Sequence, residues 1–105
     1  MSISTREELK NIIDKYGTFI LLFTASWWGP CKKAGPFIKG CASMLKKDIN
    51  LFTIDVDKGS DISSYLRIRS VPSIFFFYNQ KRQYFISSSK EKEITQFFKK
   101  IQLVL

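Results

Sequence analysis

Histidine is absent from this chain of 105 residues, and cysteine occurs only twice, at Cys31 and Cys41. The lack of histidine excludes a Cys-His catalytic pair and the commonest zinc ligand, and two cysteines are too few to close a structural zinc site. We therefore expect no metal site and no cofactor. Long apolar runs are also lacking, since none reaches the roughly 18 residues that a membrane-spanning helix needs.

The two cysteines are not expected to form a disulfide with each other. They lie ten positions apart in one predicted helix, which at about 1.5 Å per residue separates them by roughly 15 Å. A disulfide needs Cα atoms about 4.4–6.8 Å apart. The first eight residues are polar and include Glu7 and Glu8, unlike a secretory signal. We therefore expect free thiols and a cytoplasmic protein that is not associated with a membrane.

Acidic residues are scarce relative to basic ones: nine Asp and Glu against 17 Lys and Arg, a net charge of +8. Such an excess attracts nucleic acid, an anionic membrane or an acidic protein. A nucleic-acid site needs basic residues that converge on one groove, which a linear sequence does not show. Nucleic acid therefore remains the least favoured partner. The length and the hydrophobic content of 45% predict one domain over residues 1–105 and a monomer, with the ten phenylalanines mainly in the core.

Helical and strand patterns alternate along the chain. The first half predicts a helix capped by Ser4 or Thr5 and ended by Gly17, a strand at 18–24, and a helix from Pro30 that contains Pro36 and has Met44 and Leu45 on its apolar face. A strand at 49–56 and a short helix follow; this helix is capped by Ser60 or Asp61 and runs to about Arg67. The last part predicts a strand at 73–78, a turn at 79–81, a strand at 83–87 and a helix capped by Ser89. This order predicts an α/β fold with a central mixed β-sheet, helices on both faces, and the final hairpin supplying antiparallel edge strands.

One stretch draws attention within this pattern. The apolar run Phe19–Phe23 leads into Ala25-Ser26-Trp27-Trp28-Gly29-Pro30-Cys31-Lys32. Gly29 and Pro30 occupy the middle of what would be a Cys-x-x-Cys redox motif. Trp28 stands where the first cysteine would be.

These residues resemble the active-site segment of the thioredoxin family, and the likeness covers nearly the whole chain. Pro36 lies five residues after the second cysteine position, Asp55-Val56-Asp57 resembles the end of the family's next strand, and Arg69-Ser70-Val71-Pro72-Ser73 resembles its loop with a cis-proline. The resemblance implies a thioredoxin fold. It also implies a groove beside Pro72 in which family members bind extended peptides.

The departures from the family fall on its chemistry. In thioredoxins the first cysteine attacks a substrate disulfide and the second resolves the mixed disulfide, yet here Trp28 replaces the nucleophile. The resemblance also implies a buried aspartate six residues earlier, where this chain has Leu22. Whether the chain is an enzyme is therefore left open. Cys31 has the position of the resolving cysteine, and it is either a reactive thiol or a vestigial one.

Three functions follow from these residues. The first is a protein-binding or regulatory module with little dithiol–disulfide reductase activity, which uses Trp27, Trp28, Gly29, Pro30, Val71 and Pro72 to hold a protein or peptide. The second is a monothiol redox protein in cell redox homeostasis that forms mixed disulfides through Cys31. The third is a basic nucleic-acid-binding module. Trp28 has two interpretations within the first: an exposed anchor for a partner, or a ring that folds back to fill the vacated site.

Overall fold

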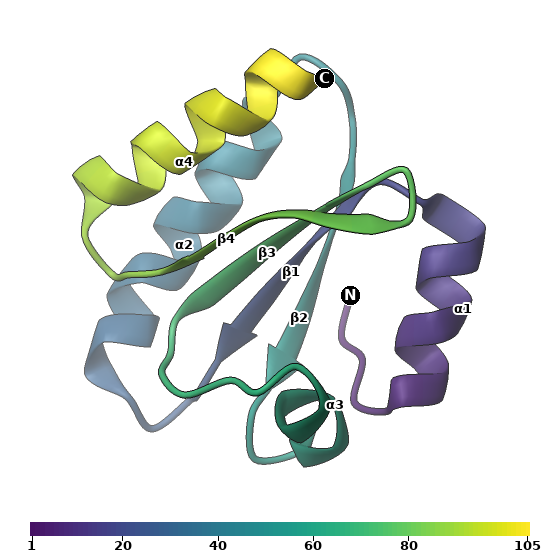
Figure 1. Ribbon diagram of the computed structural model, residues 1–105. Helices are drawn as coiled ribbons and strands as arrows, with labels where there is room; N and C mark the ends of the chain where they lie inside the picture. The colour runs from purple at the N-terminus through teal and green to yellow at the C-terminus, as the bar shows by residue number, and fades with distance from the viewer.

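Two layers of helices enclose a four-stranded mixed sheet in the computed structural model, which describes all residues, 1–105 (Figure 1). The predicted α/β architecture is confirmed. In chain order the elements are α1 (Arg6–Tyr16), β1 (Phe19–Thr24), α2 (Gly29–Ser43), β2 (Asn50–Asp55), α3 (Ser60–Tyr65), β3 (Ser73–Tyr78), β4 (Lys81–Ser87) and α4 (Glu91–Val104). None of these helices is both long enough and apolar enough to cross a membrane.

The sheet has the strand order β2-β1-β3-β4, with β1 parallel to β2 and the other neighbours antiparallel. The prediction that both hairpin strands lie at the edge is wrong for β3, which pairs with β1 in the interior of the sheet. The physical reason is its composition: Ser73 to Phe77 are all buried, and a strand that is buried on both faces needs neighbours on both sides. β4 alone forms that edge.

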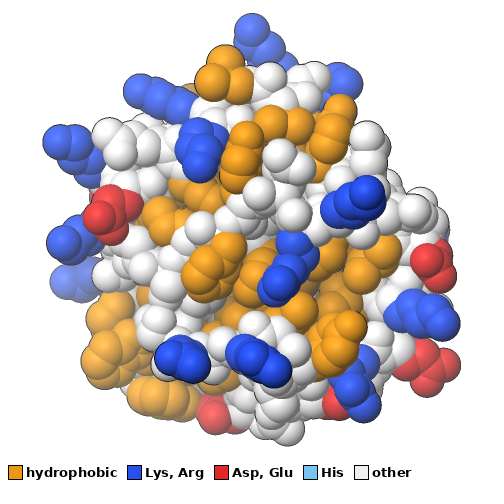
Figure 2. All heavy atoms as spheres, in the orientation of Figure 1, with side chains coloured by type: hydrophobic (Ala, Val, Ile, Leu, Met, Phe, Trp, Pro, Cys, Tyr) orange, Lys and Arg blue, Asp and Glu red, His pale blue; other side chains and the backbone are white.

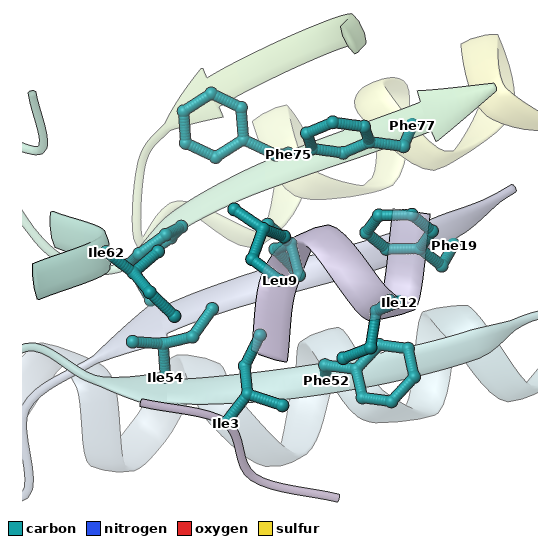
Figure 3. Close-up of a cluster of buried hydrophobic side chains, with 11 residues drawn as sticks. Ile3, Leu9, Ile12, Phe19, Phe52, Ile54, Ile62, Phe75 and Phe77 are labelled. Carbon is teal, nitrogen blue, oxygen red and sulfur yellow. The ribbon is translucent and has the colours of Figure 1, made fainter. Parts of the chain in front are cut away.

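Each face of the sheet carries its own apolar cluster. On the side of α1 and α3, residues such as Leu9, Phe19 and Ile62 pack together between the helices and the strands (Figure 3). On the opposite side, Leu22, Ile38 and other aliphatic residues pack against α2 and α4. Eight of the ten phenylalanines are buried, as expected. Phe37 is half-buried, and Phe85 is exposed because no helix covers its face of β4.

Local signals set some helix ends as predicted and others not. Thr5 caps α1 in a capping box with Glu8, and Pro36 lies inside α2. The predicted caps of the two later helices are wrong. Gly59 precedes α3, and Lys90 precedes α4, where the hydroxyl of Ser88 rather than Ser89 accepts from the Lys90 amide at 3.0 Å.

The end of α2 and the β3–β4 turn also differ from prediction. α2 ends at Ser43, so Met44 is a C-cap residue that points into solvent instead of lying on the apolar face. β4 begins at Lys81, two residues earlier than expected. The turn is tight because Asn79 and Gln80 both adopt positive φ, 51° and 70°, the conformation that two-residue hairpin loops require.

Two further features were not predicted. The amino-terminal segment runs beside the outer edge of β2: the Ile3 amide donates to the Thr53 carbonyl at 3.2 Å, and the Thr53 amide donates to the Met1 carbonyl at 2.8 Å. Gly59, at the start of α3, is packed so closely that a Cβ atom there would lie 2.6 Å from Cγ2 of Ile54. Only glycine fits this position without displacing its neighbours.

Candidate functional site

The turn between β1 and α2 presents the two tryptophans. Thr24 ends the strand, Ala25 is buried behind it, and the Trp28 amide donates to the Ala25 carbonyl at 3.2 Å to close the turn. Trp28 is the N-cap residue of α2, with extended backbone. An indole has no acceptor for the free amides of a first helical turn, and the helix begins without a side-chain cap.

Trp27 is held in place by an acidic side chain from a different loop. Its ring is 64% exposed, and its Nε1 donates to Oδ2 of Asp57 at 2.7 Å. Asp57 is itself fixed, because its amide donates to Oδ1 of Asp55 at 2.9 Å. A hydrogen bond to a carboxylate is stronger than one between neutral groups. The exposed indole therefore has a defined orientation.

Trp28 lies against Trp27 at the surface. Its side chain is 43% exposed, and the two rings meet edge to face with centroids 6.0 Å apart and planes at 62°. Aromatic pairs favour this arrangement. Of the two interpretations of Trp28, the surface position agrees with the structure, because the ring does not fold into the interior. We call the exposed surface of Trp27 and Trp28 the tryptophan tip.

Cys31 lies in the first turn of α2 but is shielded from solvent. It is 3% exposed, and its amide donates to the Trp28 carbonyl at 3.1 Å. Both cysteines are free, and Cys41 lies further along the same helix, as predicted. Burial, followed by the charge of Glu91, raises the pKa of the Cys41 thiol above its ordinary value. No cluster of three or more potential ligands for a metal ion occurs in the chain.

The interior beneath α2 is apolar. Leu22 is buried on β1, with Thr53 of β2 on one side and Ile74 of β3 on the other. It belongs to the apolar cluster that α2 completes with Ala34 and Ile38. The position where the resemblance implies a carboxylate thus holds a side chain that neither accepts nor donates a proton.

The Pro72 loop reaches the same end of the sheet as the tryptophan tip, because Ser73 pairs with Phe23 near the end of β1. The Val71–Pro72 peptide bond is cis, as the resemblance implied. Pro72 is buried and Val71 packs against the cluster on the α1 side. All seven predicted site residues, Trp27, Trp28, Gly29, Pro30, Cys31, Val71 and Pro72, therefore occur at this one end of the sheet.

Serine hydroxyls support this loop, which sequence reasoning missed. The Ser73 hydroxyl, 1% exposed, donates to the Ser70 carbonyl at 2.6 Å, and the Ser87 hydroxyl lies within hydrogen-bond distance of those of Ser70 and Ser73. Ser70 and Ser73 flank the Val-Pro pair in sequence, but the contribution of Ser87 depends on the register between β3 and β4. The network ties the loop to the edge strand.

Comparison with known proteins identifies the scaffold. A family profile described as Thioredoxin matches residues 1–100. The chain belongs to the thioredoxin family. It is 35% identical over 96 residues to a thioredoxin of Mycoplasmoides gallisepticum, a match that covers 88% of this chain and 95% of that protein. A thioredoxin of Ophiophagus hannah is 31% identical over 97 residues, with 90% and 88% covered.

Solved structures agree on the thioredoxin fold. The X-ray structure of Fasciola hepatica thioredoxin matches with a TM-score of 0.84 at 20% identity, covering 94% of this chain and 96% of that one. The central mixed sheet with helices on both faces is thus the thioredoxin fold, as the sequence predicted. The thioredoxin-like scaffold is retained throughout.

Proposed function

We propose that this thioredoxin-family protein binds an extended segment of a partner protein at the tryptophan tip and the Pro72 loop, and that it has little dithiol–disulfide reductase activity. Membership of the family supports a thioredoxin-like redox function in the broad sense. The proposal is narrower, because it names partner binding at the tryptophan tip as the main function. The observation that carries it is the exposed pair of indoles, with Trp28 in the position of the nucleophile.

The chemistry of the side chains supports the loss of reductase activity. Disulfide exchange begins when a thiolate attacks a substrate disulfide, and the second thiol completes the cycle. An indole neither ionises to a thiolate nor forms a disulfide. Leu22 gives Cys31 no acceptor for its proton. Two separate requirements of the thioredoxin cycle are therefore unmet at Trp28 and Leu22.

The geometry of the tip supports binding. Exposed tryptophans are frequent anchors of protein interfaces, because they bury a large apolar area and donate one hydrogen bond. The bond to Asp57 orients Trp27 before a partner arrives, so that less side-chain freedom is lost on binding. The backbone of Val71 supplies the edge along which an extended peptide pairs.

A monothiol function for Cys31 is the alternative within redox chemistry. A reactive thiol needs access to solvent and thiolate character, whereas Cys31 is 3% exposed. In a Cys41→Ser background, alkylation of the native protein reports Cys31 alone. The proposal expects slow alkylation that accelerates on unfolding. Rapid alkylation of the folded protein near neutral pH favours the monothiol function instead.

Two assays test the proposal itself. We expect insulin reduction at the background rate of the reductant, and a rate like that of a thioredoxin refutes the proposal. Partner capture is then compared between the native protein, Trp28→Ala, and Met44→Ala, which removes an even more exposed apolar side chain at the C-cap of α2. Capture should be lost only with Trp28→Ala. Because both tryptophans of the chain lie at the tip, a purified partner should also shift the intrinsic fluorescence to shorter wavelength.

A further inference from the structure

A second surface, away from the tryptophan tip, lies between α3 and β4. A hollow of about 360 Å³ is bounded by the loop that follows α3 and by the last two strands; its lining includes Leu66, Arg67, Ile68, Phe75, Arg82 and Phe85. A second hollow of about 370 Å³ shares Leu66 and Arg82 with it and continues toward Leu9 on α1. We call the two together the β4 groove. Figure 2 shows this face, with apolar side chains over its middle, Lys and Arg among them, and Asp and Glu at the margin.

The floor of the β4 groove is apolar and open. Phe85 is 54% exposed, and its ring packs on that of Phe75 with centroids 4.7 Å apart. The remaining phenylalanines of the chain are buried or half-buried. An exposed aromatic ring that adjoins further apolar side chains is typical of a surface that another molecule covers.

The rim of the groove is positively charged. None of the residues that line the two hollows is acidic, and neither Arg67 nor Arg82 forms an ion pair. Arg82 lies over the ring of Phe75, 5.6 Å from its centroid. Arg67 has a φ of 56°, a left-handed conformation in which glycine is the usual residue at a helix end. An arginine there places an unpaired charge at the groove despite the strain of its backbone.

The backbone of β4 is also available. β4 is an edge strand, and its outer side pairs with no other segment. The opposite edge of the sheet differs, because the amino-terminal segment already bonds to β2 at Thr53. Exposed edge strands accept an added strand from another chain through main-chain hydrogen bonds. The β4 groove therefore combines a free strand edge, an apolar floor and a basic rim.

We propose that the β4 groove binds an extended, acidic peptide segment of a partner protein. The segment adds as a strand along β4, sets carboxylates against Arg67 and Arg82, and lays apolar side chains on Phe85 and Leu66. Every second side chain of an added strand points to the same face, so residues i and i+4 set carboxylates against the arginines while residue i+2 packs on the apolar floor. This site is separate from the tryptophan tip and does not depend on the proposed function there.

Charge and geometry favour this occupant over two others. A second copy of this chain carries the same basic rim and the same net charge of +8, so self-association along β4 is disfavoured. Single-stranded nucleic acid needs free aromatic faces on which bases stack. Here Arg82 and Phe85 already cover the ring of Phe75, whereas the main-chain edge of β4 suits a peptide.

The test uses a fluorescein-labelled peptide, Glu-Ser-Val-Ser-Glu-Ser-Val-Ser, in which Glu and Val alternate along one face of a strand, and measures fluorescence anisotropy at low salt. The comparison peptides are a block peptide of the same composition and the same alternating peptide with Lys in place of each Glu, and oligo(dT) serves as the nucleic-acid probe. The groove variant combines Arg67→Gly, which suits the left-handed backbone, with Arg82→Gln. The matched control, Lys47→Gln with Lys99→Gln, removes the same charge from exposed sites outside the groove.

We expect the alternating acidic peptide to bind, and the groove variant to weaken it by about tenfold or more. The matched control should stay within about twofold of the native protein, as distant rim charges contribute little. Phe85→Thr should weaken binding as well. In the bound state the backbone amide signals of residues 81–87 should shift in NMR spectra.

Several results overturn the proposal. One is equal binding of the alternating and block acidic peptides, which indicates charge attraction without a strand. Another is equal weakening by the groove and control variants. No binding at millimolar peptide, or no shift of the β4 amides, also refutes it. If oligo(dT) binds more tightly than the peptide and depends on Arg67 and Arg82, the groove is a nucleic-acid site instead. Trp28→Ala should leave peptide binding unchanged, which separates this result from the test of the tip.

Discussion

Replacing Trp28 by cysteine tests how much of the redox machinery the scaffold retains. The Cys31 amide bonds to the Trp28 carbonyl at 3.1 Å, so the two residues lie one turn apart at the start of α2. Residues three apart on a helix have Cβ atoms about 5–6 Å apart, and a disulfide needs about 3.5–4.5 Å. Residue 28 is an N-cap with extended rather than helical backbone, so a small adjustment there can bring its Cβ within disulfide distance of that of Cys31. We therefore expect Trp28→Cys to form a disulfide with Cys31 on oxidation.

The restored dithiol should be a poor reductase. The introduced thiol takes a surface position where the native side chain is 43% exposed, and Cys31 stays buried, so the division between attacking and resolving thiols is available. The proton of Cys31 has no acceptor, since Leu22 is aliphatic. Because general base catalysis contributes about 10²–10⁴-fold, we expect insulin reduction about a hundredfold or more below that of a thioredoxin.

The assay uses a Cys41→Ser background, so that thiol titration counts only the pair. The count should fall from two to none on oxidation, and Trp28→Ser in the same background gives the baseline for insulin reduction. Thiols that persist after oxidation contradict the geometry of the turn. A reduction rate equal to that of a thioredoxin contradicts the importance of the proton acceptor at position 22.

Three further predictions concern stability and reactivity. Leu22→Asp should lower the free energy of unfolding by about 4–5 kcal/mol. Burial raises the pKa of the introduced carboxyl, so this loss of stability should grow as the pH rises above about 4. Urea unfolding measures the loss, and a loss that does not depend on pH contradicts the prediction. Hydrogen bonds, first from the Ser4 amide and then from the Thr5 side chain, lower the pKa of Glu8 from its ordinary value near 4.5. The stability that these bonds add is present above that value and is lost as the pH falls. Tm should therefore drop less on acidification in Glu8→Gln than in the native protein, and equal drops refute the role of the capping box. In a Cys31→Ser background, Cys41 of the folded protein should react with iodoacetamide more slowly than Cys41 of the unfolded chain, since burial and then Glu91 raise its pKa. Glu91→Gln should speed the reaction modestly. Equal rates in the folded and unfolded chains exclude the raised pKa.

Much of the fold could be predicted because local and global signals agree. The helical spacing of apolar residues in α1 and α4, the capping box at Thr5 and the apolar strands β1 and β3 each specify an element without reference to the rest of the chain. The end of α2 was harder. Met44 continues the helical spacing but no other element covers it, and pattern alone does not distinguish a covered face from a bare one.

The remaining differences arise from contacts between distant segments. The early start of β4 depends on two residues that accept positive φ without glycine, which propensity disfavours. Phe85 looks like a core residue in sequence, and it is exposed because no helix covers its face of β4. At the candidate site, the motif residues were predicted from resemblance. The bond from Trp27 to Asp57 and the serine network were not, because each joins segments that only the fold brings together.

The orientation of Trp27 at the tryptophan tip depends on the packing of Gly59 in the interior. Asp57, whose carboxylate orients Trp27, lies two residues before it, and Gly59 rests directly against Ile54 in the core. A side chain at position 59 would force this loop or its neighbours to shift, and a shift of the loop would move the carboxylate relative to the indole. A substitution remote from the tip would thus leave both tryptophans present yet misaligned. A variant at this glycine would therefore alter partner binding at the tip although Trp27 and Trp28 themselves were unchanged.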